Sequence, residues 1–201
     1  MKLRNSITTV LIFIITAFYI TAHYAPTVTW GGIPLQAQLF LVGKLPLGNG
    51  SYLGVFAGQW WRVFTVVLTH ASWEHIGFNM IAFFQLGNLV ERFYGRSRYI
   101  VLLIVSALLS SILFLLLVPA DQPSVGASGM IFGIFGAMLV SGKKMGIDYQ
   151  QLVVWIVINL LITFTGSNIA WQAHMGGFAA GVGLALIFHA LPRRTTRQSW
   201  E

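Results

Sequence analysis

The sequence predicts an all-α polytopic membrane protein that forms a single domain over residues 1–201. Three observations favour this fold class. The chain is 56% hydrophobic and only 8% charged, whereas a soluble domain carries about 25% charged residues. Its apolar residues gather into six stretches, and most of its basic residues lie at the ends of those stretches. The net charge of +7 therefore indicates a membrane topology signal rather than a nucleic-acid-binding surface.

Six spanning helices are expected from the apolar stretches. A helix needs about 20 residues to cross the hydrocarbon core, and the third and sixth stretches qualify outright. The second carries Asn79, Gln85 and Asn88, so neighbouring helices should shield it from lipid. The fourth begins at Ser128 and is too short to cross unless the loop before it dips into the membrane. The stretches run roughly over 7–23, 76–90, 99–118, 128–141, 152–166 and 174–191.

The basic residues predict the orientation of the chain. With six spans, ten of the twelve lysines and arginines fall on one side, and only Lys44 and Arg62 fall on the other. The positive-inside rule then predicts a plasma-membrane protein with both termini cytoplasmic, in tails at about residues 1–6 and 192–201. The start of the chain also fits a signal peptide. Removing it would leave five spans with inconsistent charge, so a retained first helix is favoured.

A structured loop in the outer leaflet is expected over residues 24–75. Its Trp and Tyr rings suit the headgroup layer, and its Gly and Pro residues interrupt regular structure. The aromatic residues are Tyr24, Trp30, Tyr52, Trp60, Trp61 and Trp73. The sequence therefore predicts a membrane-embedded first loop.

A serine and a histidine open two of the apolar stretches. Ser128 lies in the motif Gly-Ala-Ser-Gly, residues 126–129, and His174 begins the sixth stretch. An imidazole can remove the proton of a serine hydroxyl and return it to a leaving group. Polar residues of this kind inside a membrane indicate a functional site. The expected topology puts both at similar depth under the outer face, so the pair predicts hydrolysis of a bond inside the membrane.

Small residues one turn apart follow both the serine and the histidine. Such stripes let two helix backbones approach closely in lipid. If the two stripes face each other, Ser128 and His174 come within contact range. The alternative is that the stripes belong to different interfaces, because stripes of this kind are common in membrane helices. They consist of Gly129, Gly133 and Ala137 in the fourth stretch and Gly177, Gly181 and Ala185 in the sixth.

Hydrolysis of an amide also needs hydrogen-bond donors for the developing oxyanion. Ser128 begins a helix, where backbone N–H groups are unpaired and lie at the positive end of the dipole. His75 and Asn79 lie four residues apart at the outer end of the second stretch, and both can donate. Polar pairs of this kind also join helices together, and the residues alone leave both interpretations open.

Other hydrolytic mechanisms fit the chain less well. The order and spacing of His70, Glu74 and His75 differ from the His-Glu-x-x-His metalloprotease motif and from its inverted form. The chain has no cysteine, which excludes a thiolate nucleophile or a cysteine zinc site. Asp121 and Asp148 both fall in loops on opposite sides, which excludes an intramembrane aspartate pair. We expect no metal and no cofactor.

Taken together, these residues are similar to the signature motifs of the rhomboid intramembrane serine proteases, over roughly residues 55–190. The motifs match jointly and in order, which makes the resemblance specific. They are Trp61-Arg62, His70-x4-His75-x3-Asn79, Glu91-x3-Gly95, Gly126-Ala127-Ser128-Gly129 and Ala173-His174-x2-Gly177.

The resemblance implies a role for each matching residue. Ser128 would be the nucleophile and His174 the general base and acid, with His75, Asn79 and the Ser128 N–H as the oxyanion hole. A third, acidic member is absent, so packing must orient His174, and Phe132 one turn after Ser128 is placed to stack on it. Structural support is expected from Arg62, His70, Glu91, Gly126, Gly129, Gly177 and Gly181.

The resemblance also implies a minimal six-helix rhomboid-like bundle whose active site opens to the extracytoplasmic side. Its partners would be membrane lipid and transmembrane protein substrates, cut near their outer ends and entering laterally past the fifth span. Relatives prefer a small residue before the scissile bond. Two alternatives are an inactive relative that binds membrane clients and a small membrane transporter. Both Ser128 and His174 are present, and the polar residues cluster in the outer half, so neither alternative is favoured. No oligomeric state is predicted.

Overall fold

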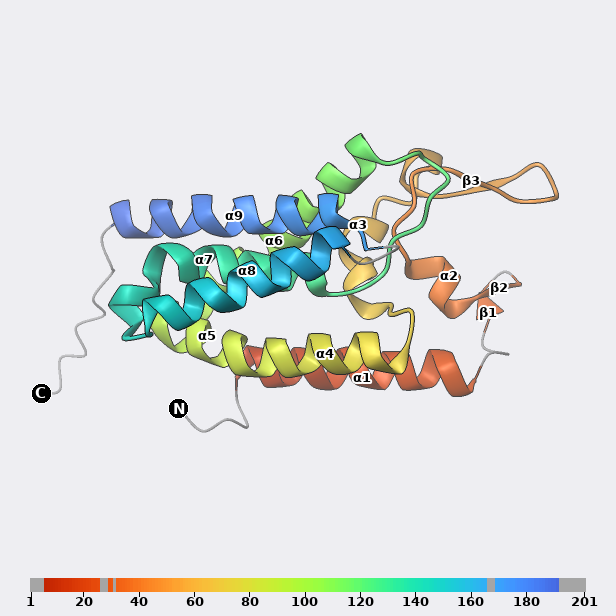
Figure 1. Cartoon of the computed structure of the whole chain (residues 1–201). Coiled ribbons are helices and arrows are strands. Elements are labelled where there is room, and N and C mark those ends of the chain that lie inside the picture. The colour runs from red at the N-terminus through yellow and green to blue at the C-terminus, as the bar shows by residue number, and fades with distance from the viewer. Residues whose placement is uncertain (1–5, 26–28, 31, 166–168, 192–201) are drawn as a thin grey trace, which may run out of the picture.

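The computed structural model describes residues 6–25, 29–30, 32–165 and 169–191 and is mostly helical (Figure 1). Its long helices follow the six predicted stretches within a few residues at each end. The predicted tails lie outside the described residues, except for Ser6, whose side chain caps the first helix. The helices are α1 (Ile7–Tyr24), α4 (Trp73–Ala82) with α5 (Asn88–Tyr94), α6 (Arg96–Leu117), α7 (Ser128–Ser141), α8 (Tyr149–Thr165) and α9 (Trp171–Ala190).

A π-helical turn, η4 (Phe83–Gly87), joins α4 to α5 and makes one helical stretch of them. Within the described residues, α1, α6 and α9 are each long and apolar enough to cross a membrane. The chain is therefore a helical membrane protein. After α7, a short 3₁₀ turn, η5 (Gly142–Met145), leads toward α8.

The first loop, between α1 and α4, is ordered by several short elements that gather at one end of the helices (Figure 1). Two antiparallel pairs of two-residue strands add a little sheet to a chain for which only helices were predicted. The elements are β1 (Thr29–Trp30), β2 (Ile33–Pro34), α2 (Leu35–Leu39), β3 (Leu45–Pro46), β4 (Tyr52–Leu53), η2 (Val55–Ala57), α3 (Arg62–Thr65) and η3 (Val66–Leu68).

Arg62 is the centre of this loop and is completely buried. Its Nη1 donates to the carbonyl oxygens of Ala37 and Phe40 at 2.9 and 2.7 Å, at the C-terminal end of α2. Its Nε donates to Oε1 of Gln59 at 2.7 Å. A guanidinium presents several donors in one plane, so a single side chain can bind both α2 and the turn before α3.

Glu91 anchors the first helix at the opposite end of the molecule. Its carboxylate accepts hydrogen bonds from the backbone N–H groups of Ile7 and Thr8 at 2.9 and 3.1 Å. The Thr8 hydroxyl also donates to it at 3.0 Å and lies 2.8 Å from the Tyr99 hydroxyl. A carboxylate is favourable at a helix N-terminus, where the N–H groups lack partners. Glu91 on α5 therefore joins α1, α5 and α6.

Helix α7 lies in the middle of the bundle, packed against both α6 and α9. Eleven of its fourteen residues are buried, as expected for a helix that is apolar all round. A Cβ atom added at Gly177 or Gly181 of α9 would overlap the carbonyl oxygens of Gly129 or Gly133, respectively. The two glycine stripes therefore meet, as predicted, and bring the two backbones into contact.

The glycines of α7 also serve a second interface. An added Cβ at Gly129 would overlap the hydroxyl of Ser110, and one at Gly133 would overlap that of Ser106, both on α6. The two stripes thus face each other, and the α7 stripe has a second contact, with α6, that the sequence did not predict. The α9 glycines contact the backbone of α7, and the α7 glycines also leave space for the serine hydroxyls of α6.

We expect Gly181→Ala to destabilise the protein, because its methyl group would overlap a carbonyl oxygen on α7 that cannot move away. Overpacking of this kind typically costs about 1–3 kcal/mol. Gly183→Ala is the matched control on the same helix, since nothing lies within 4 Å of an added Cβ there. That control should be neutral or slightly stabilising. Thermal unfolding of both variants in detergent measures the difference, and equal melting temperatures would contradict the tight α7–α9 contact.

Candidate active site

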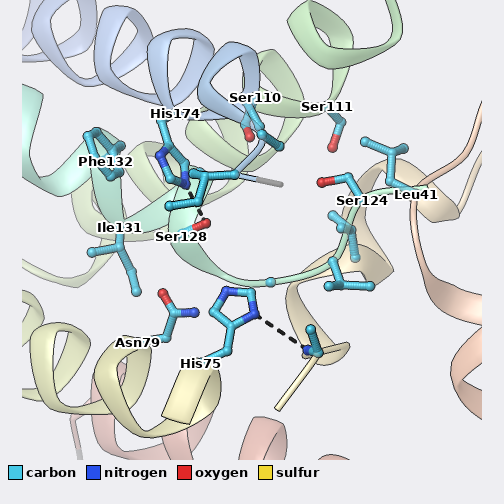
Figure 2. A pocket seen from close by; sticks show the side chains of 18 of the residues that line it. Leu41, His75, Asn79, Ser110, Ser111, Ser124, Ser128, Ile131, Phe132 and His174 are labelled. Atoms are coloured by element: carbon cyan, nitrogen blue, oxygen red, sulfur yellow. Dashed lines mark hydrogen bonds between the residues drawn. The ribbon is translucent and has the colours of Figure 1, made fainter. Parts of the chain in front are cut away.

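The serine and histidine singled out in the sequence are hydrogen-bonded to each other. Ser128 Oγ lies 2.7 Å from His174 Nε2 (Figure 2). Ser128 is the first residue of α7, and His174 lies in the first turn of α9. Both helices begin at the same end of the bundle (Figure 1). The contact between their glycine stripes thus brings together two residues that are 46 positions apart in the chain.

An aromatic ring orients the histidine. Phe132 stacks on His174 with ring centroids 4.2 Å apart and an angle of 8° between the planes. Phe132 is one helical turn after Ser128, so its side chain lies on the same face of α7, and His174 is only 8% exposed. The ring therefore keeps the imidazole plane parallel to itself and leaves Nε2 directed at the serine.

His75 lies across the site from Ser128, in the first turn of α4 (Figure 2). Its Nδ1 accepts a hydrogen bond from the backbone N–H of Ala71 at 3.4 Å. A neutral imidazole carries one proton, so this bond leaves the proton on Nε2 as a donor. The Nε2 edge lies against Gly126: a Cβ added there would be 2.9 Å from both Nε2 and Cε1. Gly126 also has φ +118°, a conformation that favours glycine.

Asn79 lies one turn after His75 and points to the same space (Figure 2). It is 7% exposed. Its amide nitrogen is buried and has no hydrogen-bond partner in the described part of the chain. A buried donor without a partner costs free energy, and such groups are found where a ligand completes the bonding. The predicted pair of donors, His75 and Asn79, is therefore brought beside the Ser128–His174 pair.

Backbone hydrogen bonds tie the segment before Ser128 to the first loop. Leu41 and Ser124 exchange two such bonds, at 3.0 and 2.7 Å, and the N–H of Gly126 donates to Val66 at 3.2 Å. Lys44 N–H also donates to the carbonyl of Ala120 at 2.7 Å. These contacts could not be predicted from the sequence, because a short bridge between two irregular segments leaves no periodic pattern.

A cavity of about 440 Å³ surrounds the serine, extends along α4 and α7 and reaches Asn159 of α8. Its polar lining comes from His75, Asn79, Ser128 and His174, from the hydroxyls of Ser110, Ser111 and Ser124 (Figure 2), and from Asn159. The opposite part of its wall is apolar and includes Phe78, Ala82, Ile131 and Phe135. A site with a few converging polar groups in a mostly apolar cavity is typical of substrate binding.

The remaining predicted supporting residues lie outside this cavity. Arg62 and His70 are buried in and just after the first loop, and Glu91 is at the far end of the bundle. Gly177 and Gly181 form the contact with α7 described above. Within the described residues, no three His, Asp or Glu side chains are grouped where they could hold a metal ion.

The family model for the rhomboid domain matches residues 57–191. The chain belongs to the rhomboid family. It is 32% identical over 169 residues to the putative rhomboid protease YdcA of Bacillus subtilis (strain 168), covering 77% of this chain and 85% of that protein.

Two other relatives are longer than the rhomboid region. The rhomboid protease GluP of B. subtilis (strain 168) is 34% identical over 172 residues, which is 78% of this chain but 34% of GluP. RHOMBOID-like protein 5 of Arabidopsis thaliana is 31% identical over 172 residues, covering 80% of this chain and 55% of that protein. The similarity to both therefore concerns the rhomboid domain.

We expect Gly126→Ala to slow the reaction of Ser128 with a serine-directed phosphonate. The new methyl group would displace His75 and would also require a strained φ, at a cost of about 1–3 kcal/mol. Gly146→Ala is the matched control, because Gly146 has φ +74° with nothing within 4 Å of an added Cβ. Labelling rates measured by mass spectrometry should fall only for Gly126→Ala; equal rates for both variants would show that His75 is not held by this contact.

Proposed function

We propose that this rhomboid-family chain is an intramembrane serine endopeptidase in which Ser128 and His174 form the catalytic dyad. The observation that carries the proposal is the 2.7 Å hydrogen bond from Ser128 Oγ to His174 Nε2 inside the cavity. Family membership and relatives named as rhomboid proteases support the same activity.

The geometry suggests how the dyad cleaves an amide. Ser128 Oγ attacks the scissile carbonyl carbon while His174 Nε2 takes the hydroxyl proton. The negative charge on the carbonyl oxygen is stabilised by the backbone N–H of Ser128, at the positive end of α7, and by the side chains of His75 and Asn79. His174 then returns the proton to the leaving amine. Water hydrolyses the acyl-enzyme through the same two proton transfers.

The lengths of the helices are consistent with six membrane spans. The stretch from Trp73 to Tyr94 contains 22 residues and is long enough to cross a core of about 30 Å. Helix α7 has 14 residues, or about 21 Å at 1.5 Å per residue. If its C-terminal end reaches the inner face, Ser128 lies roughly 9 Å below the outer face. The site would thus be inside the membrane but close to external water.

The charge distribution supports cytoplasmic termini in a plasma-membrane protein. Helix α1 begins, and α7 and α9 end, at the same end of the bundle (Figure 1). The lysines at 143 and 144 lie at that end, directly after α7. Arg62 and Lys44 lie in the first loop, at the end that carries Ser128. The positive-inside rule assigns the first of these ends to the cytoplasm, so the active site would open to the extracytoplasmic side.

We infer that the substrates are transmembrane segments of other proteins. The apolar part of the cavity wall follows α4 and α7, through Phe78, Ala82, Ile131 and Phe135, which suits lateral entry of an apolar segment from lipid. A helix hides its amides in backbone hydrogen bonds, so a substrate should carry helix-weakening residues near the cut. A small residue before the scissile bond would suit the crowded surroundings of Ser128. No observation favours the inactive client-binding protein or the transporter.

Ser128→Ala and His174→Ala should each abolish cleavage of a single-span substrate and leave folding intact, because each removes a partner of the same step. Purified protein in vesicles, a panel of single-span substrates and mass mapping of the cut provide the measurement. Ser106→Ala and His189→Ala are matched controls and should keep activity. Cleavage by a folded Ser128→Ala protein would exclude the proposed nucleophile.

Loss of one oxyanion donor should reduce turnover by roughly 10²–10³-fold with little effect on KM. We expect this of His75→Ala and, at the lower end of the range, of Asn79→Ala. Asn88→Ala is the control, since the Asn88 amide donates to the carbonyl of Phe84 in its own helix at 2.7 Å. If Asn79→Ala lowers the melting temperature but keeps full turnover, Asn79 joins helices and does not stabilise the oxyanion.

A further inference from the structure

The outer end of α1 packs against the beginning of α4 through a group of aromatic rings. This aromatic cluster consists of Tyr19, His23, Tyr24 and Trp73. Trp73, the first residue of α4, has its ring centroid 4.9 Å from Tyr19, 5.4 Å from His23 and 6.1 Å from Tyr24. Since α4 carries His75 and Asn79, the cluster joins the first helix to the helix of the oxyanion donors.

Two members of the cluster have the exposure expected of membrane anchors, but Tyr19 does not. Tyr24 is 72% exposed and Trp73 is 43% exposed, as suits rings in the headgroup layer. Tyr19 is only 3% exposed. Its ring points into the protein, so anchoring in the lipid headgroups does not explain it.

A chain of ring contacts leads from Tyr19 to the active site. Tyr19 meets His70 edge to face, with centroids 6.2 Å apart and planes at 89°. The His70 ring in turn lies 5.1 Å from the His75 ring, at 69°. Burial lowers the pKa of His70 to about 3, so His70 is neutral and packs as an uncharged aromatic ring. Contacts of this geometry are favourable between aromatic rings.

His75 has few other restraints on its ring. Its hydrogen bond from the Ala71 N–H is long, at 3.4 Å. A hydrogen bond of that length restrains the orientation of the imidazole ring only weakly. Gly126 limits the ring at its Nε2 edge. His70 is therefore the ring against which His75 rests. His70 is held by Tyr19 and by a hydrogen bond from Gln36 Nε2 to its own carbonyl at 2.8 Å.

We propose that Tyr19 is a positioning residue for the reaction: through His70 it holds the His75 imidazole so that Nε2 points at the developing oxyanion. The first helix thereby contributes to turnover without touching the substrate. This inference rests on the proposed role of His75. A displacement of about 1 Å at a catalytic group can lower a rate by roughly 10²-fold, so a small movement of the His75 ring is enough to affect turnover.

The test is a double-mutant cycle on the full-length protein in vesicles. Tyr19→Met removes the ring while keeping an apolar side chain, and should lower kcat by roughly 10- to 100-fold with KM unchanged. Tyr19→Phe keeps the ring and should restore the rate. In a His75→Ala background, Tyr19→Met should cause no further loss, because the group that it positions is gone. Ile15→Ala is the matched control, because Ile15 lies one turn away in α1 and is also buried. This variant should lower the stability of the protein without lowering kcat.

A spectroscopic readout tests the same contact independently of protease activity. In protein carrying ¹³C-labelled histidine, the Cε1–H resonance of His75, assigned by its loss in His75→Ala, should shift in Tyr19→Met and stay in place in Ile15→Ala. If Tyr19→Met does not fold, His70→Met removes the intermediate ring and should behave in the same way in both measurements. The inference would be overturned if Tyr19→Met and His75→Ala lowered kcat additively. It would also be overturned if the His75 resonance did not shift in Tyr19→Met. A wild-type protein that cleaves no substrate would instead count against the proposed function, while the resonance would still report on Tyr19.

Discussion

The contact between the backbones of α7 and α9 is the constraint on which the site depends. Gly177 and Gly181 leave no space for a side chain against the carbonyl oxygens of α7. In a bilayer the lipid is as apolar as the helices, so close packing supplies the attraction that the hydrophobic effect supplies in water. Ser128 and His174 are at the ends of these two helices, and the 2.7 Å distance between them follows from the helix contact. Phe132 then only needs to fix the plane of the imidazole.

The position of the oxyanion donors relative to Ser128 depends on contacts outside the α7–α9 pair. The first loop is folded around the buried guanidinium of Arg62. Backbone bonds from Leu41 and Val66 fix the segment before Ser128 against this loop. That segment places Gly126 next to His75. Hydrogen bonds of the first loop thus fix the position of Ser128 relative to the oxyanion donors. The packing of α7 on α9 fixes its position relative to His174.

Periodic features of the sequence predicted the parts of the structure that repeat along a helix. The helix extents and the glycine stripes follow from apolar or small residues at one-turn spacing, whereas the stacking of Phe132 on His174 was expected from the family resemblance. The two-residue strand pairs, the π-turn η4 and the bridge between Leu41 and Ser124 were not predicted. The strand pairs and the π-turn are too short to show a period in the sequence, and the bridge joins two irregular segments that are far apart in the chain. The insertion of Ser106 and Ser110 against the α7 glycines was also missed. A lone serine in an apolar helix has the same pattern whether it bonds its own backbone or fits a neighbouring helix.

The anchoring of α1 by Glu91 has a consequence for the order of assembly. Helix α1 is synthesised first, yet the carboxylate that accepts its first N–H groups is 84 residues further along the chain. The partner hydroxyl on Tyr99 comes later still. Until Glu91 is made, Ser6 caps the N–H of Thr9, but the N–H groups of Ile7 and Thr8 have only water as a partner. The N-terminal end of α1 can therefore be anchored only once α5 and the beginning of α6 have been made, whereas its other end meets α4 through rings that are synthesised earlier.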